Sequence, residues 1–258
     1  MSGRLSAAER EALARQDARL LHAQQMPPGR DAMLAHARHA ARLLKDHQAA
    51  SPSARAITHI NGLFDRSIPE PAKTTLACRQ GCGHCCHQQV ILYAPELFFL
   101  AAHIRGRAGM AEKLRGAAGS GYGQGKSAPC PLLEDEACSV YDARPLACHA
   151  FVSLDVNDCI STFRYLKERQ IRMPHGYDIM RNACRMILLA AAKGAGLPIH
   201  CYELGSSALG AILTQDHAEK RWLRGENVLG ALEIMPPMIP PEIATQIDAM
   251  AAAIAPAL

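Results

Sequence analysis

Apolar residues recur at helical spacing in the first and last thirds of the chain. Steps of three and four positions place such residues on one face of a helix. Four apolar stripes show this spacing: Leu34, Ala37, Ala41 and Leu44; Met180, Cys184, Ile187 and Ala191; Leu204, Ala208 and Ile212; Ile243, Ile247, Met250 and Ile254. These stripes predict helices on both sides of a differently built centre.

Capping and breaking residues give the predicted helices their limits. Residues 4 to about 65 read as helical, and Ser6 followed by Glu9 forms a capping box at their start. The Pro-Pro-Gly run at 27–29 interrupts the helix, and Asp31 can cap the next one. Near the C-terminus, the proline-rich run at 236–241 predicts a rigid break.

The centre of the chain, from about 70 to 160, loses this periodicity and is rich in cysteine, glycine and proline. Residues 89–93 read as a short strand, and Pro95 suits the first turn of a helix that ends near Arg105. The glycine-rich stretch 116–125 predicts a flexible loop.

Together these patterns predict a mostly α fold, in which helical flanks surround a loop-rich cysteine-cluster core with few short strands. We expect an N-terminal helical segment at 1–66, a cysteine-cluster metal-binding domain at 67–160 and a C-terminal helical segment at 161–258. The last segment packs with the core and can form one domain with it.

Composition narrows the class of protein. The 258 residues are 49% hydrophobic and 20% charged, which allows a sizeable core and argues against disorder. A net charge of +4 is too small to indicate nucleic-acid binding, so the basic face with Arg38, Arg42 and Lys45 reads as solvated. The longest apolar run, 186–192, is far below a membrane span, and the first residues lack a signal-peptide pattern. We therefore expect a cytoplasmic protein without membrane or nucleic-acid partners.

Eight of the ten cysteines lie between positions 78 and 159. They form two runs: Cys78, Cys82, Cys85 and Cys86; then Cys130, Cys138, Cys148 and Cys159. Thiols this dense in a reducing compartment indicate metal binding more than disulfides. Four cysteines within nine residues, beside polar neighbours, also make a poor apolar core. Cys184 lies on an apolar helix face and Cys201 opens a predicted helix, so both read as core residues.

Four thiolates complete one structural zinc site or one [4Fe–4S] cluster, so eight can complete two centres. Cys85 and Cys86 are adjacent, and in an extended segment their side chains would point to opposite sides. The two cysteines could therefore bind two different centres, or only one of them could be a ligand. Gly81 and Gly83 allow a tight fold around metal, and His84 and His87 could supply nitrogen ligands.

Two motif matches are rejected. Cys78, Cys82 and Cys85 have the three-cysteine spacing of radical S-adenosylmethionine enzymes, but that fold alternates strands and helices, unlike this chain. Residues 120–127 approach a phosphate-binding loop, yet they begin with Ser120 and lack the preceding strand and following helix.

The two cysteine runs, with the intervening Cys-Pro-Leu-Leu and Cys-Ser-Val-Tyr-Asp-Ala-Arg-Pro-Leu-Ala-Cys sequences, resemble the YkgJ-like cysteine-cluster family, described as a zinc- or iron-chelating domain. The resemblance covers about 78–160. It implies a metal-binding set of Cys78, Cys82, Cys85, Cys86, Cys130, Cys138 and Cys148, with either zinc or an iron–sulfur cluster as cofactor. Cys159 is our addition from the count of eight.

The same resemblance places Tyr141, Arg144 and Pro145 in the motif. A guanidinium near a thiolate cluster would offset its negative charge, so we expect Arg144 beside the metal ligands and not in a surface turn with Asp142 or Asp135. His149 occupies a position where relatives often carry arginine. It could be a ligand, a neighbour of a ligand or a neutral replacement.

Three functions are compatible with these patterns. The first is a zinc- or iron-chelating, iron–sulfur or carrier protein. The second is an iron–sulfur enzyme that modifies a protein side chain, because the cysteine block is also similar to that of flagellin lysine N-methylases. The third is a zinc-stabilised interaction module. The sequence leaves open whether the protein is an enzyme and which protein partner or substrate it meets.

Overall fold

A computed structural model describes residues 6, 8, 11, 28–116, 129–165, 167, 170–204, 208–234 and 239–258. The α-helices are α2 (Arg30–Leu44), α3 (Pro52–Ser67), α4 (Glu70–Thr74), α5 (Ala94–Ile104), α6 (Met110–Gly116), α7 (Leu146–His149), α8 (Val156–Cys159), α9 (His175–Gly194), α10 (Ala208–Thr214), α11 (Ala218–Trp222) and α12 (Pro241–Ile254). The strands are β1 (Ile91–Tyr93), β2 (Leu133–Glu134), β3 (Ala137–Cys138) and β4 (Cys201–Glu203). Short helical turns of other types are η1 (His84–His87), η2 (Tyr141–Ala143), η3 (Ile160–Arg164), η4 (Gly230–Leu232) and η5 (Ala255–Ala257). The predominantly α fold predicted from the sequence is confirmed.

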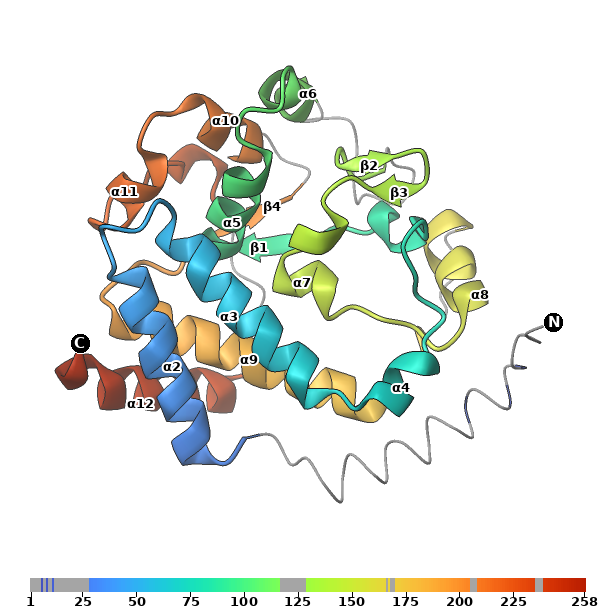
Figure 1. The fold of residues 1–258 in the computed structure, drawn as a ribbon, viewed down its shortest axis with the longest axis horizontal. Helices are drawn as coiled ribbons and strands as arrows, with labels where there is room; N and C mark the ends of the chain where they lie inside the picture. The colour runs from blue at the N-terminus through green and yellow to red at the C-terminus, as the bar shows by residue number, and fades with distance from the viewer. Residues whose placement is uncertain are drawn as a thin grey trace.

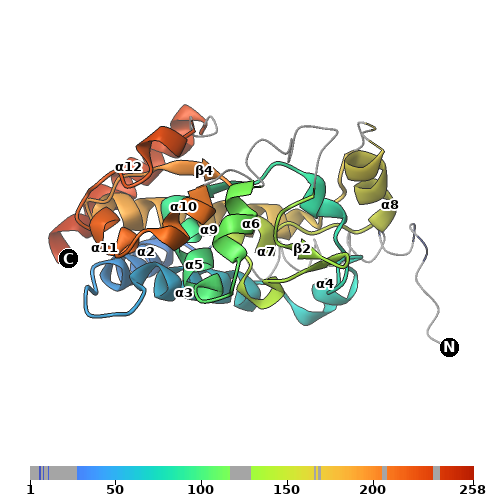
Figure 2. The ribbon, with the colours of Figure 1, turned by 90° about the horizontal axis from the view of Figure 1, so that it is seen from above.

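Four helices from both ends of the chain form the scaffold. Helix α9 packs against α2, α3 and α12, and α3 also packs against α5. Figures 1 and 2 place α11 and α12 at one end of the molecule and α8 at the other. Among the described residues, no helix combines the length and the apolar character that crossing a membrane requires.

The predicted apolar stripes form the interior of this scaffold. Ala37, Ala41 and Leu44 are fully buried, while Leu34 packs at the edge of the core. The stripe of α9 is buried throughout, and three of the four residues predicted for α12 are buried: Ile247, Met250 and Ile254. On the far side of α2, Arg42 and Lys45 are exposed and Arg38 is half-buried.

Some local predictions were wrong. Gly29, not Asp31, is the N-cap of α2. Cys201 opens strand β4 and not a helix, and Leu204 follows that strand, outside α10. The strand is fixed by antiparallel pairing of β4 with β1, in which Tyr93 faces Cys201 across the ladder, a long-range contact that local spacing cannot reveal.

Other predictions hold or fall outside the described part. The predicted strand at 89–93 is β1, and Pro95 lies in the first turn of α5, whose C-cap is Arg105. The capping box needs Glu9, which lies outside the described residues. So do most of the predicted helix before α2, residues 117–125 of the predicted loop, the rejected phosphate-loop match and residues 236–238 of the proline-rich break.

Candidate metal centre

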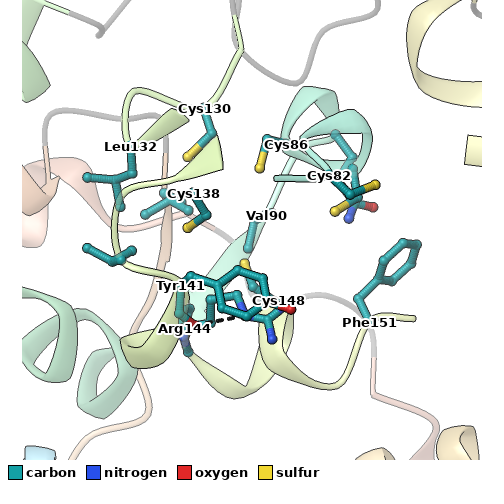
Figure 3. A pocket seen from close by; sticks show the side chains of 15 residues that line it. Cys82, Cys86, Val90, Cys130, Leu132, Cys138, Tyr141, Arg144, Cys148 and Phe151 are labelled. Carbon is teal, nitrogen blue, oxygen red and sulfur yellow. Dashed lines mark hydrogen bonds between the residues drawn. The ribbon is translucent and has the colours of Figure 1, made fainter. Parts of the chain in front are cut away.

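Six cysteines from separate parts of the chain line one small cavity of about 50 Å³. Cys82, Cys85 and Cys86 come from the loop and turn at η1, Cys130 and Cys138 from the region of the β2–β3 hairpin, and Cys148 from α7. Figure 3 shows Cys86, Cys130, Cys138 and Cys148 around a common space, with Cys82 on its η1 side. Apolar residues complete the wall: Val90, Leu132, Val140, Phe151 and Leu204.

Glycines allow the first cysteine run to fold against the hairpin. Gly81 has φ +83°, a conformation that other residues adopt only with strain. A Cβ at Gly83 would lie 2.7 Å from the Leu133 side chain and 2.9 Å from the Glu136 carbonyl oxygen. The two glycines noted in the sequence therefore act differently. Gly81 allows the left-handed backbone conformation of the turn, and Gly83 allows the loop to pack closely against the hairpin backbone.

The β2–β3 hairpin carries Cys138 and has a constrained turn. Leu133 pairs with Cys138 and Glu134 with Ala137, which leaves a two-residue turn. Both turn residues, Asp135 and Glu136, have positive φ angles, 48° and 60°. Glu136 forms an ion pair with Arg164 of η3, so the turn is tied to the segment that follows Cys159.

Helix α7 holds Cys148 and is anchored by a carboxylate that the sequence did not single out. Glu96 is 3% exposed, and its carboxylate accepts hydrogen bonds from the backbone amides of Tyr93 (3.1 Å) and Ala147 (3.0 Å). Burial raises the pKa of Glu96. The Glu96 side chain joins the start of α5 to the first turn of α7. A glutamate in the first turn of a helix is a local signal for the hydrogen bond to the Tyr93 amide, but not for the one to Ala147.

Cys78 and Cys159 lie outside the cavity wall, at its side, where both contact Ser153. The Ser153 backbone amide donates to Cys78 Sγ at 3.2 Å, and the Ala77 amide donates to the Ser153 carbonyl oxygen at 2.8 Å. The Ser153 side chain is also hydrogen-bonded to Cys159 and affects its pKa. The segment that carries Ser153 therefore joins the first and the last cysteine of the set.

A salt-bridge network fixes this segment from behind. The Arg172 guanidinium donates to Asp158 at 2.7 and 3.1 Å and to Asp155 at 2.8 Å. The Asp158 side chain is fully buried. The sequence alone did not predict this network, because the positions of the two aspartates and the arginine match no known motif.

Burial keeps most of these thiols in the protonated form. It raises the pKa of Cys78 to about 11 and that of Cys159 to about 12. It also raises the pKa of Cys138 and, well above its ordinary value, that of Cys148. A metal ligand must be a thiolate, so binding would release these protons and metal binding would be coupled to ionisation.

Arg144 lies in the cavity wall, where its charge lowers the pKa of Cys78, Cys85 and Cys138 against the effect of burial. Its guanidinium lies 4.0 Å from the centre of the Tyr141 ring and donates to the Tyr141 carbonyl oxygen at 3.0 Å. Arg144 and Tyr141 therefore line the same cavity as six of the cysteines, and their role beside metal ligands stays a prediction. Pro145 also lines the cavity, as N-cap of α7.

The histidines near the cysteines are directed elsewhere. His149 Nε2 lies 2.8 Å from Asp65 Oδ1 of α3, and its ring stacks edge-on with Phe64. His84 Nδ1 accepts from Arg164 at 3.4 Å. None of His84, His87 and His149 lines the cavity.

The adjacent pair Cys85 and Cys86 lies in the 3₁₀ turn η1, so the expected extended geometry was wrong. A hydrogen bond between the two thiols is the largest cause of the raised pKa of Cys85. The side chains therefore face each other instead of pointing to opposite sides. Cys85 is also within electrostatic reach of Cys78, Cys138 and Cys148.

The donors fit a zinc or iron centre in their chemistry: buried thiols, an amide that donates to sulfur and a guanidinium close by. Their positions, however, do not form a complete ligand set. Among the described residues, no three His, Cys, Asp or Glu side chains are placed so that they could hold one metal ion. The thiols would have to move within the cavity wall to bind one.

Residues 77–174 match the model of the CxxCxxCC family, which is described as a "putative zinc- or iron-chelating domain". The resemblance found in the cysteine runs is confirmed for this segment, which includes all eight clustered cysteines and Arg172. No curated protein and no solved structure matches the chain. Cys184 and Cys201 belong to the hydrophobic core, as expected.

Proposed function

We propose that the protein binds zinc or iron through cysteine thiolates at two neighbouring centres. The observation that carries this proposal is the gathering of six cysteines, from separate segments of the chain, around one cavity with Arg144 in its wall. Thiolate ligands suit both zinc and iron–sulfur clusters, and a bound cluster would add one-electron chemistry that zinc lacks.

The first centre would use Cys86, Cys130, Cys138 and Cys148. These four side chains surround the same space in Figure 3, and Cys130 and Cys138 are among the thiols whose charge raises the pKa of Cys148. The Cys130 amide also donates to the Cys86 carbonyl oxygen at 2.7 Å, which ties the two ligand segments together. Four thiolates would complete a closed tetrahedral site.

The second centre would use Cys78, Cys82, Cys85 and Cys159. Cys159 is within electrostatic reach of the other three, and Cys78 of Cys82 and Cys85. The amide of Ser153 supplies the hydrogen bond to sulfur that is common around thiolate ligands. Because Cys85 also faces the first group, it would lie between the two centres.

Closed centres of this kind favour a structural or carrier role, since they leave no coordination position for a substrate. An enzyme that modifies a protein side chain would need an open position. A zinc-stabilised interaction module would need only one metal to hold the loops.

The test is anaerobic purification followed by measurement of zinc, iron, acid-labile sulfide and the visible spectrum. It is repeated for the double variants Cys130→Ser/Cys138→Ser and Cys78→Ser/Cys159→Ser. Two independent centres predict that each double variant keeps the metal of the other centre. Loss of all metal in both would show a single shared centre, and a wild-type protein without zinc or iron would contradict metal binding altogether.

Iron with equimolar sulfide and a brown colour would identify a cluster, and zinc in a colourless protein would identify a structural site. Cys184→Ser serves as the matched control, because Cys184 is a fully buried core thiol on α9. Its metal content should equal that of the wild type.

A further inference from the structure

A second cavity, of about 200 Å³, lies between α9, α12 and the end of β1, and shares no lining residue with the cysteine cavity. Its aliphatic wall is formed mainly by Leu189 of α9 and by Ile243 and Ile247 of α12. Three polar side chains also line it: Tyr93, Asn182 and Arg185. An apolar cavity with a few convergent polar groups is the usual form of a small-molecule site.

The Tyr93 hydroxyl is a buried donor whose protein partner is a thiol. The residue is 3% exposed, and within the described part of the chain the partner of its hydroxyl is the Cys201 thiol, with no oxygen or nitrogen in hydrogen-bonding position. The Cys201 thiol lies close to it, but sulfur is a weak acceptor. Burial raises the pKa of Tyr93 to about 12, so the hydroxyl keeps its proton at neutral pH. A ligand oxygen would accept from this buried hydroxyl more strongly than the thiol does.

Arg185 supplies a positive charge at the same cavity. It is half-buried, and in the described residues its guanidinium takes part in no ion pair or hydrogen bond. The charge of Arg185 acts on Glu96, but the two oxygens of that carboxylate accept from backbone amides. Arg181, one helical turn earlier, adds a second positive charge that is partly balanced by Asp178.

We propose that this cavity binds a small organic monocarboxylate with a short aliphatic body. The carboxylate would pair with Arg185 and accept from the Tyr93 hydroxyl, while Asn182 is an exposed residue of the wall. The aliphatic body would contact Leu189, Ile243 and Ile247. A phosphate group or a polyanion would not use this apolar wall.

The experiment measures binding of 4-methylvalerate to the full chain by titration calorimetry and ligand-observed NMR. The uncharged analogue 4-methylpentan-1-ol and the cation 4-methylpentylamine test the charge requirement with the same aliphatic body. We expect the acid to bind in the millimolar range or tighter, the alcohol at least about tenfold more weakly and the amine not at all. The tenfold figure follows from a charge-assisted hydrogen bond worth about 1.5 kcal/mol or more.

Variants separate this site from a general apolar surface. Arg185→Met should weaken binding of the acid at least about tenfold, and Tyr93→Phe should weaken it by a smaller factor. Ile243→Trp should abolish binding by filling the cavity while leaving Arg185 in place. Lys193→Met, on the same helix but exposed and paired with Asp248, should change nothing.

Equal affinity for the acid and the alcohol would overturn the proposal. So would unchanged binding in Arg185→Met, or no binding of the acid to the wild type. Circular dichroism spectra of each variant identify a misfolded protein, and Ile243→Trp gives an independent answer should Arg185→Met not fold. None of these measurements depends on the metal content of the cysteine cavity.

Discussion

The guanidinium of Arg144 lies 4.0 Å from the centre of the Tyr141 ring, and both side chains line the cavity that six cysteines share. Stacking restrains the guanidinium plane, so the charge is held at the cavity instead of rotating into solvent. Asn61 of α3 donates to the Arg144 carbonyl oxygen at 3.0 Å and fixes the backbone at the same point.

Replacement of Arg144 should weaken metal binding without removing a ligand. Arg144→Met leaves the thiolate charge unbalanced, and we expect a loss of about 10- to 100-fold in metal affinity. Arg144→Lys keeps the charge but not the planar stack on Tyr141, so its affinity should lie between those of Arg144→Met and the wild type. Competition with a chromophoric chelator measures all three. Equal affinities would show that the charge of Arg144 has no part in metal binding.

Single cysteine variants should divide into two classes. Cys148→Ser and Cys82→Ser each remove a predicted ligand, one from each proposed centre, so the metal content per chain should fall in both. Cys184→Ser replaces a core thiol that faces neither centre and should keep its metal. Elemental analysis of the purified variants gives the answer, and equal metal content in all three would refute the ligand assignment.

Gly83→Ala should disturb the site through backbone contact. The new Cβ would lie 2.9 Å from the Glu136 carbonyl oxygen, and the hairpin would have to shift. Overpacking of this kind costs about 1–3 kcal/mol in the free energy of unfolding, and metal affinity should fall as well.

Gly29→Ala provides the control, because its Cβ would meet no atom within 4 Å. Urea unfolding and chelator competition compare the two variants. If Gly83→Ala matched the wild type in both measurements, the close approach of loop and hairpin would have no energetic consequence.

Arg172→Met should destabilise the fold strongly. It removes the partly exposed guanidinium that pairs with the fully buried Asp158, and a buried group left without its hydrogen-bond partner costs about 1–3 kcal/mol. Arg55→Met removes an exposed ion pair with Asp46 and should cost about 1 kcal/mol or less. Urea unfolding curves of both variants test the difference, and similar losses would contradict it.

A cluster of three histidines should make stability depend on pH. His36 Nδ1 lies 3.3 Å from His59 Nε2, and the His39 ring packs edge-on against His59. Burial, then the charges of His39, His36 and Arg66, lower the pKa of His59 from 6.5 to about 4. Above pH 6.5 both folded and unfolded states keep this ring neutral, so it has no effect there.

As the pH falls from 6.5 to about 4, the unfolded chain takes up a proton that folded His59 does not. The free energy of unfolding should therefore fall across this window and lose this dependence below it. His59→Asn should flatten the slope, whereas His47→Asn, at an exposed position, should not. Urea unfolding at several pH values between 4 and 7 measures it, and identical slopes for His59→Asn and the wild type would count against this assignment.

Local patterns in the sequence predicted the helical scaffold well, because burial of one face leaves a direct mark on spacing. The stripe of α9 and the helix that begins near Pro95 are of this kind. They could not predict that Cys201 pairs with Tyr93 in a sheet, since the two residues are distant in sequence.

The cysteine set could be identified from its density, but its surroundings could not. Glu96 accepts a hydrogen bond from the Ala147 amide, and Arg172 donates to the Asp158 carboxylate. In neither case does the sequence indicate the partner. The 3₁₀ turn that brings Cys85 to face Cys86 is likewise set by packing of the loop against the hairpin, where Gly83 lies.

The packing of α2, α3, α9 and α12 involves none of the eight clustered cysteines. This scaffold buries its own apolar stripes, so its formation does not require metal. We therefore expect the scaffold to form before the cysteine region receives its metal. Depletion of metal in the cell would then leave chains with a folded scaffold that can still be loaded, in contrast to small zinc domains that unfold when their metal is removed.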